Sequence, residues 1–160
     1  MEPTVTPISF ITDSPQQTEI LGKRLGSLLG PGDVITLSGE LGGGKTCFVR
    51  GVVAAASPTA LEMVASPTFA ILNEYPGRPS ILHYDCYRLR GSDDAFELGF
   101  EEQLSSSSIC LIEWPERIQA ILPDQRIDIL FDYLDENRRR ITLIAHGQRA
   151  TEQLTSLVDH

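Results

Sequence analysis

The stretch VITLSGELGGGKT, residues 34–46, decides the fold of this chain of 160 residues. Its first four residues, 34–37, form a short apolar run that is typical of a buried β-strand. Residues 39–46 then match the pattern G-x-x-x-x-G-K-[ST] in full. From Gly44 to about residue 56 the sequence predicts a helix. A buried strand, a glycine-rich loop and a helix in this order predict a phosphate-binding loop, or P-loop, in an α/β domain.

Each fixed position of this loop has a physical reason. Glycines allow positive φ angles, so that backbone N–H groups turn inward around phosphate oxygens. The start of the helix adds the positive end of its dipole to the same place. Lys45 is expected to reach the β- and γ-phosphates, and the Thr46 hydroxyl to ligate magnesium. The residues expected to bind ATP and Mg²⁺ here are Gly42, Gly43, Gly44, Lys45, Thr46 and Cys47.

A P-loop protein also needs acids for magnesium and for water, and two candidates stand at the ends of apolar runs. Asp85 follows the run 81–84, and Glu113 follows the strongly apolar run ICLI, 109–112. Four consecutive apolar residues indicate a strand buried on both faces, whose terminal acid emerges at the ligand-binding edge of an open sheet. Either acid alone is equally compatible with an ordinary solvated strand end. Their occurrence together with the P-loop favours a functional role for both.

The remaining sequence predicts alternating strands and helices with a hairpin near the end. We expect helices over 15–29 (capped by Asp13 or Ser14), 92–104 (capped by Ser92 or Asp93, with Phe96, Leu98, Phe100 and Leu104 apolar), 115–122 and 150–158, and strands over 8–12, 68–75, 81–87, 109–112, 126–133 and 139–145. This order predicts a single domain, 1–160, with an α/β three-layer P-loop NTPase fold, a mixed central sheet and a late β-hairpin.

Two further features are less specific. Ser66-Pro67-Thr68-Phe69 places hydroxyl groups between the P-loop helix and the next strand, where phosphate-sensing switches lie in related folds. The same segment is also compatible with a simple turn before a strand. Several arginines, among them Arg138, are candidates for stabilising negative charge in a transition state, although most arginines are surface residues.

Composition narrows the function classes. The net charge of −9, from 13 basic and 22 acidic residues, argues against autonomous nucleic-acid binding, because neutralising phosphates supplies most of that affinity. No apolar run is long enough to span a bilayer, and no signal peptide is evident, so we expect a cytoplasmic protein without membrane contact. The three cysteines are widely spaced and form no C-x-x-C pair, which indicates neither a disulfide framework nor a zinc site.

Five segments together resemble the TsaE (YjeE) family of bacterial ATPases, which takes part in the threonylcarbamoyl modification of tRNA adenosine next to the anticodon. They are GELGGGKT, SPTF, HYDCYRL, ELGFEE and ICLIEWPERI, in this order from about residue 12 to residue 117. The P-loop is generic to many NTPases, whereas the patterns HxDxYRL and IEWPER are far more specific. Gly43 in place of the usual alanine and Cys47 in place of a common threonine are minor departures.

The resemblance implies roles for individual residues. Thr46 and Glu113 match the magnesium-binding pair, Asp85 an acid near the metal or the attacking water, and Thr68 a switch-like threonine. Trp114 matches a tryptophan beside the catalytic glutamate. The segment around Ser14 and a basic residue of the late hairpin, Arg138 or a neighbour, are implied to approach the nucleotide. The implied partners are a threonylcarbamoyl transferase (TsaD) and its paralogue TsaB, with tRNA reached only through that complex.

Two other functions stay open on the sequence. P-loop domains of this size often transfer phosphate to a small molecule, but such kinases usually carry an arginine-rich lid, and none stands out. A regulatory GTPase commonly selects guanine with an Asn-Lys-x-Asp motif, which the sequence lacks.

Overall fold

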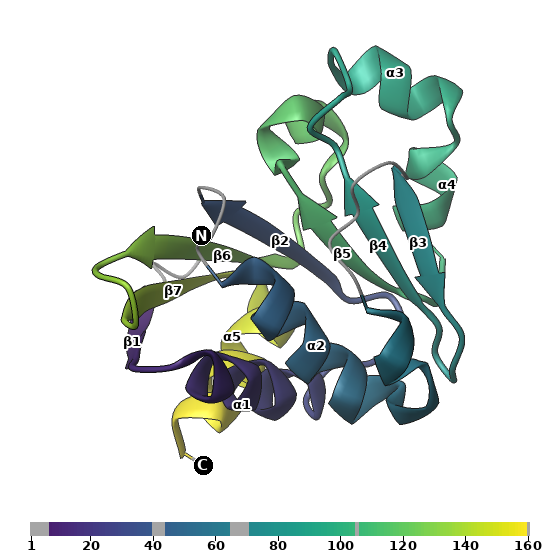
Figure 1. Cartoon of the computed structure of the whole chain (residues 1–160). Helices are drawn as coiled ribbons and strands as arrows, with labels where there is room; N and C mark the ends of the chain where they lie inside the picture. Colours follow the sequence, from purple (N-terminus) through teal and green to yellow (C-terminus); the bar gives the residue numbers. More distant parts are fainter. Residues whose placement is uncertain (1–6, 40–43, 65–70, 105, 160) are drawn as a thin grey trace.

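A seven-stranded mixed sheet forms the centre of the computed structural model, which describes residues 7–39, 44–64, 71–104 and 106–159 (Figure 1). The strand order across the sheet is β1-β7-β6-β2-β5-β4-β3. The elements, in chain order, are β1 (Ile8–Thr12), α1 (Pro15–Gly26), β2 (Val34–Gly39), α2 (Lys45–Ala56), the 3₁₀ segment η1 (Pro58–Met63), β3 (Leu72–Tyr75), β4 (Ile81–Asp85), α3 (Ser92–Glu97), α4 (Phe100–Leu104), β5 (Ile109–Glu113), the 3₁₀ segment η2 (Pro115–Ile121), β6 (Arg126–Tyr133), β7 (Arg139–His146) and α5 (Gln148–Asp159).

Five strands end at the same edge of this sheet. β6, β2, β5 and β4 are mutually parallel. β1 runs in the same direction, because β7 lies between β1 and β6 and is antiparallel to both. The segments that follow these five strands therefore converge on one edge, where an open α/β sheet binds its ligands. The starts of α1 and α2, the β6–β7 turn and the ends of β4 and β5 all belong to this edge.

One face of the sheet is covered by α1, α2 and α5 (Figure 1). The first two helices pack unusually closely, because glycines stand at their contact. A Cβ added at Gly22 of α1 would meet the backbone carbonyl of Phe48, and one added at Gly51 of α2 would meet the carbonyl of Glu19. The absence of these side chains lets the helix backbones touch. Since α1 begins beside Ser14 and α2 begins at Lys45, this contact fixes two parts of the ligand-binding edge relative to each other.

The other face is covered only over half of its width. Phe100 and Leu104 of α4, Ala95 of α3 and Ile118 of η2 pack there on the buried side chains of β4 and β5. Over β1, β7 and β6 the same face carries exposed or half-buried side chains, including Ile11 and Leu130. The strands reflect this difference: β5 is buried at four consecutive positions, whereas β6 and β7 alternate.

The structure confirms the predicted α/β fold with a mixed sheet and a late hairpin. β3 and β4 form the expected antiparallel pair, and β6 and β7 the expected hairpin. Boundaries shift slightly: α1 ends at Gly26 and not at 29, and β4 ends at Asp85 and not at 87. Ser14, one of two predicted caps, is the N-cap of α1, where its Oγ accepts a hydrogen bond from the Gln17 N–H at 3.2 Å. Residues 68–70 of the strand expected over 68–75 lie outside the described residues.

The single helix predicted over 92–104 is wrong. Gly99 adopts a φ of 77°, a left-handed conformation that ends α3 before α4 begins. Phe96 and Leu98, predicted to be apolar positions of one buried face, are 66% and 51% exposed. Residues two apart point to opposite sides of a helix, so that 96, 98 and 100 never shared a face. The N-cap of α3 is Gly91 and neither of the predicted caps.

The helix expected over 115–122 forms as 3₁₀ turns, with a non-helical φ of −130° at Ile118. Within the described ranges, every helix is too short or too polar to cross a lipid bilayer.

Candidate functional site

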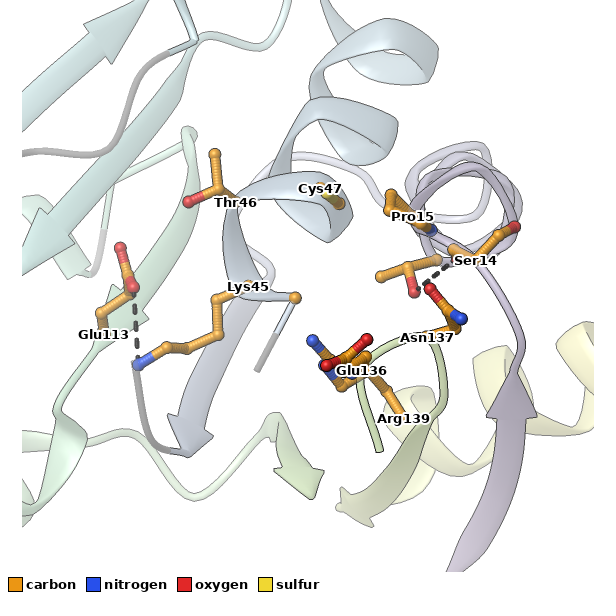
Figure 2. Close-up of a pocket in the computed structure, with 11 residues that line it drawn as sticks. Ser14, Pro15, Lys45, Thr46, Cys47, Glu113, Glu136, Asn137 and Arg139 are labelled. Atoms are coloured by element: carbon orange, nitrogen blue, oxygen red, sulfur yellow. Dashed lines mark hydrogen bonds and ion pairs between the residues drawn. The ribbon is translucent and has the colours of Figure 1, made fainter. Parts of the chain in front are cut away.

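An open cavity of about 250 Å³ lies at the edge where the five strands end. Its lining comes from four places in the sequence: the start of α1, the start of α2, the end of β5 and the β6–β7 turn. Figure 2 shows Lys45, Thr46 and Glu113 toward one side of it and the start of α1 with the hairpin turn toward the other. The lining residues are Ser14, Pro15, Thr18, Gly44, Lys45, Thr46, Cys47, Glu113, Glu136, Asn137 and Arg139.

Gly44 gives the start of α2 its shape. Its φ of 97° lies in the left-handed region, where a side chain is strained, and it stands at the N-cap position without a capping side chain. The first N–H groups of a helix lack partners within the helix. At the start of α2 these groups, together with the positive end of the helix dipole, favour a bound anion.

Lys45 is held in place before any ligand arrives. Its side chain is only 7% exposed. The Nζ donates to the Gly39 carbonyl at 2.8 Å, lies 3.8 Å from Glu113 Oε1 and sits 5.2 Å from the centre of the Trp114 ring. Such a nearly buried ammonium group requires charge compensation. A carboxylate, a carbonyl and an aromatic face supply it, and phosphate oxygens are chemically suited to take their place.

Glu113 connects this lysine to a residue outside the cavity. Its Oε2 lies 2.8 Å from Nε2 of His83, which is on the neighbouring strand β4 and only 2% exposed. Tyr75 packs beside the imidazole, with ring centres 6.2 Å apart. Burial, and after it the charge of Glu113, raises the pKa of the Tyr75 hydroxyl. Glu113 is therefore held by His83, whose ring in turn packs beside Tyr75 in the core.

Asp85 lies at the end of β4, opposite Glu113 in the parallel pairing of β4 with β5. Its Oδ1 accepts a hydrogen bond from the Tyr87 N–H at 3.0 Å, and it does not line the cavity. The structure thus brings the two predicted acids to adjacent strand ends but gives only Glu113 direct access to the cavity.

Trp114, directly after Glu113, has a φ of 58° and is the only described non-glycine residue with positive φ. Its ring packs on Tyr87 with centres 5.0 Å apart. Backbone strain of this kind persists where the surroundings hold it, and it concentrates at functional sites. Here it turns the chain sharply so that the carboxylate and the indole of consecutive residues both face Lys45.

The opposite side of the cavity is built from the start of α1 and the hairpin turn. Thr18 of α1 bonds to Thr12 at the end of β1, with 2.7 Å between their hydroxyl oxygens. Glu136 and Asn137 are exposed on the turn. Arg139 packs over the Tyr133 ring at 4.5 Å and donates to the Asp135 carbonyl at 2.6 Å. This side offers polar groups of both signs to a ligand.

The structure places Arg139, and not the predicted Arg138, on the cavity. The Arg138 side chain is 54% exposed and its Nε donates to Asp135 Oδ2 at 2.6 Å. Successive side chains of a strand point to opposite sides, so that a shift of one residue decides which arginine faces the site. The Asp135–Arg138 hydrogen bond lowers the pKa of Asp135 and raises that of Arg138.

The oxygen donors at the start of α2 and the end of β5 suit Mg²⁺. Thr46 and Glu113 line the same cavity and offer a hydroxyl and a carboxylate oxygen. No cluster of three or more His, Cys, Asp or Glu residues with metal-binding geometry occurs among the described residues. Magnesium is commonly held by only one or two protein oxygens together with substrate phosphates and water, so this small donor set fits the ion.

Several predicted site residues lie outside the described part of the chain, namely Gly42, Gly43 and Thr68. Of the others, Ser14, Gly44, Lys45, Thr46, Cys47 and Glu113 come together on one cavity. The sequence interpretation did not identify His83, Thr18, Glu136 or Asn137, and it left open whether Arg138 or a neighbour such as Arg139 approaches the nucleotide. The histidine of the HYDCYRL segment was a signal for His83, and the residues of the hairpin turn become visible only once the sheet order is known.

Comparison with known proteins identifies the family and a structure of the same fold. The family model for "Threonylcarbamoyl adenosine biosynthesis protein TsaE" matches residues 12–141. The tRNA threonylcarbamoyladenosine biosynthesis protein TsaE of Treponema pallidum is 38% identical over 133 residues, which cover 83% of this chain and 97% of that protein. Its Bacillus subtilis counterpart is 37% identical over 143 residues, covering 89% and 88%. The crystal structure of Bacillus subtilis YdiB superposes with a TM-score of 0.82 at 30% identity, over 99% of this chain and 98% of that one.

Proposed function

This chain belongs to the TsaE family of tRNA threonylcarbamoyladenosine biosynthesis, and on that premise we propose that it is a magnesium-dependent ATPase supporting this modification of tRNA. The observation that carries the proposal is the convergence of Lys45, Thr46 and Glu113 on one cavity at the N-terminus of α2. An ammonium group, a hydroxyl, a carboxylate and free helix N–H groups are the set required to hold a nucleoside triphosphate with its metal.

The phosphate end works through exchange of partners at Lys45. In the structure Lys45 Nζ lies between the Gly39 carbonyl and Glu113. In the proposed reaction the β- and γ-phosphates take over this ammonium group, which releases the Glu113 Oε1 atom. Thr46 and Glu113 would hold Mg²⁺, and the ion would neutralise charge on the phosphate oxygens. Glu113, Asp85 at the adjacent strand end and Thr68 are the candidates for positioning the attacking water.

The hairpin end binds the rest of the nucleotide. Ser14, Pro15 and Arg139 line the cavity on the side away from Glu113. Of Arg138 and its neighbours, we assign this role in nucleotide binding to Arg139, because its side chain faces the cavity while that of Arg138 pairs with Asp135. Gly42, Gly43 and Cys47 complete the phosphate loop in this proposal.

The expected partners are the threonylcarbamoyl transferase TsaD and its paralogue TsaB. The net charge of −9 supports indirect access to tRNA through such a complex. We place the protein in the cytoplasm, as a single domain spanning 1–160, and expect ATP hydrolysis to reset or release the complex between turnovers.

Phosphate release by the purified protein tests the proposal. With ATP and Mg²⁺ we expect slow release alone, faster release with TsaD and TsaB, and loss of both in Lys45→Ala and Glu113→Ala. Unchanged tRNA modification by either folded variant would contradict the mechanism. A phosphorylated small molecule without free phosphate would instead indicate a kinase, and tighter binding of GTP than of ATP a GTPase.

A further inference from the structure

We propose that His83 is a positioning residue of this site, which binds one oxygen of Glu113 so that only the other oxygen faces the phosphates and the metal. The proposal rests on the proposed ATPase function and extends it to a residue that does not line the cavity. It also assigns the carboxylate a defined mode of action, in which a single oxygen is available.

The two oxygens of Glu113 have different partners. Oε2 lies 2.8 Å from His83 Nε2, and Oε1 lies 3.8 Å from Lys45 Nζ. Since a carboxylate oxygen only accepts, the hydrogen belongs to the imidazole Nε2, which donates it. This hydrogen bond restrains rotation of the carboxylate about its last bond. When a ligand draws Lys45 away, Oε1 is released while Oε2 stays bound.

His83 is suited to this task because it does not itself move. Its side chain is 2% exposed, compared with 13% for Glu113. It shares one face of β4 with Ile81, which is fully buried, and its ring lies beside that of Tyr75, which is 1% exposed. A ring packed in this way has few alternative rotamers, so that the position of Nε2 is set by the core of the protein.

Stability alone does not account for a histidine at this position. His83 Nδ1 and the Tyr75 hydroxyl are buried, and neither has a hydrogen-bond partner among the described residues. An unpaired buried polar atom is costly, so that an apolar side chain of similar size would suit the core better. The contact to Glu113 is the one polar interaction that the imidazole makes within the described chain, and we therefore assign its role to that contact.

The test compares His83→Leu with His83→Gln, whose amide N–H reaches toward the place of Nε2. Loss of a group that orients a metal-binding carboxylate typically costs about 10–100-fold in activity or metal affinity. We expect His83→Leu to lower kcat and weaken Mg²⁺-dependent ATP binding within this range. His83→Gln should recover most of the loss. Calorimetric titration with ATP in the presence of a chelator should give the wild-type affinity for both variants, because Lys45 and the start of α2 are untouched.

Tyr75→Phe is the matched control, since it removes a neighbouring buried hydroxyl without touching Glu113. It should retain the wild-type kcat and Mg²⁺ dependence. In a Glu113→Gln background, His83→Leu should cause no further loss of Mg²⁺-dependent ATP affinity, because a positioning residue acts only through the group it positions.

The outcomes separate this inference from the proposed function. If the wild-type protein releases no phosphate from ATP, alone or with TsaD and TsaB, the ATPase proposal is wrong. If Glu113→Gln hydrolyses ATP like the wild type, the roles of both Glu113 and His83 are overturned. If Glu113→Gln is inactive but folded His83→Leu keeps the wild-type kcat and Mg²⁺ dependence, the role of His83 is overturned and the ATPase proposal stands. If His83→Leu does not fold, His83→Asn replaces it as the variant too short to reach Glu113, and equal activity of the Asn and Gln variants overturns the role.

Discussion

The two ends of the cavity differ in how firmly their side chains are held. At the phosphate end, Lys45 is 7% exposed and Glu113 13%, and both have defined partners in the core. At the hairpin end, Glu136 and Asn137 are exposed on a turn, and Arg139 is half-buried against Tyr133. The first end is organised before a ligand binds, whereas the second presents side chains that adapt to it. Chemistry demands fixed geometry, and binding of the remaining nucleotide tolerates adjustment.

We expect the largest effect from a conservative substitution of Lys45 at the phosphate end. Lys45→Arg keeps the charge, but it replaces the compact ammonium group, which lies 2.8 Å from the Gly39 carbonyl and 3.8 Å from Glu113 Oε1, by a larger planar guanidinium. We expect kcat to fall by about 100-fold or more, the scale for losing one charge-stabilising donor. The equivalent exchange at the hairpin end, Arg139→Lys, should cost only a few-fold. Steady-state phosphate release measures kcat for both variants. Equal losses of kcat would contradict the difference between the two ends.

The contact between α1 and α2 connects the two ends of the cavity, and we expect that disturbing its close packing lowers the stability of the protein. In Gly22→Ala the new Cβ meets the Phe48 carbonyl, a backbone atom that cannot rotate away. Overpacking of this kind costs about 1–3 kcal/mol of unfolding free energy. Urea denaturation measures it. The control is Gly91→Ala, where a Cβ meets nothing within 4 Å, and a similar loss in both would show that close packing is not the cause.

A pair of single substitutions tests which arginine belongs to the hairpin end. Arg139→Ala removes a cation that lines the cavity and should weaken ATP binding about 10-fold, the range of one charge-assisted hydrogen bond. Arg138→Ala removes an exposed residue paired with Asp135, and the affinity should change less than about two-fold, as expected for a surface ion pair. Isothermal titration calorimetry gives both values. The reverse order would return the role to Arg138.

Alkylation of the cysteines tests the accessibility of the cavity wall in the wild-type protein, without any substitution. Burial raises the pKa of Cys86 and Cys110 to about 12, and both thiols therefore stay protonated and unreactive at pH 8. Cys47 is half-buried on the cavity wall. Iodoacetamide followed by peptide mass spectrometry should label Cys47 alone in the folded protein, and ATP with Mg²⁺ should slow this labelling. Labelling of all three at equal rates would mean that the core opens readily.

The buried end of the site was largely predictable from the sequence, and the hairpin end was not. The P-loop, the apolar run of β5 and the acid after it each predict their own structure, because a buried parallel strand reads as continuous apolar residues. The choice of Arg139 over Arg138 depends on how β7 pairs with β6 and β1, and the local sequence pattern does not show this pairing. His83 lies within an apolar strand, where a single histidine is indistinguishable from a core residue. The break at Gly99 was missed because an apolar spacing of two residues was read as one helical face.

Trp114 has a practical consequence of its own. It is the only tryptophan of the chain, and its indole lies 5.2 Å from the Lys45 ammonium group. Tryptophan fluorescence therefore originates from one ring beside Lys45, without contributions from other tryptophans. A ligand that draws Lys45 away changes the electric field at the indole, and this changes the intensity or the wavelength of its fluorescence. The unlabelled protein thus carries its own optical reporter, and stopped-flow mixing can follow nucleotide arrival in real time.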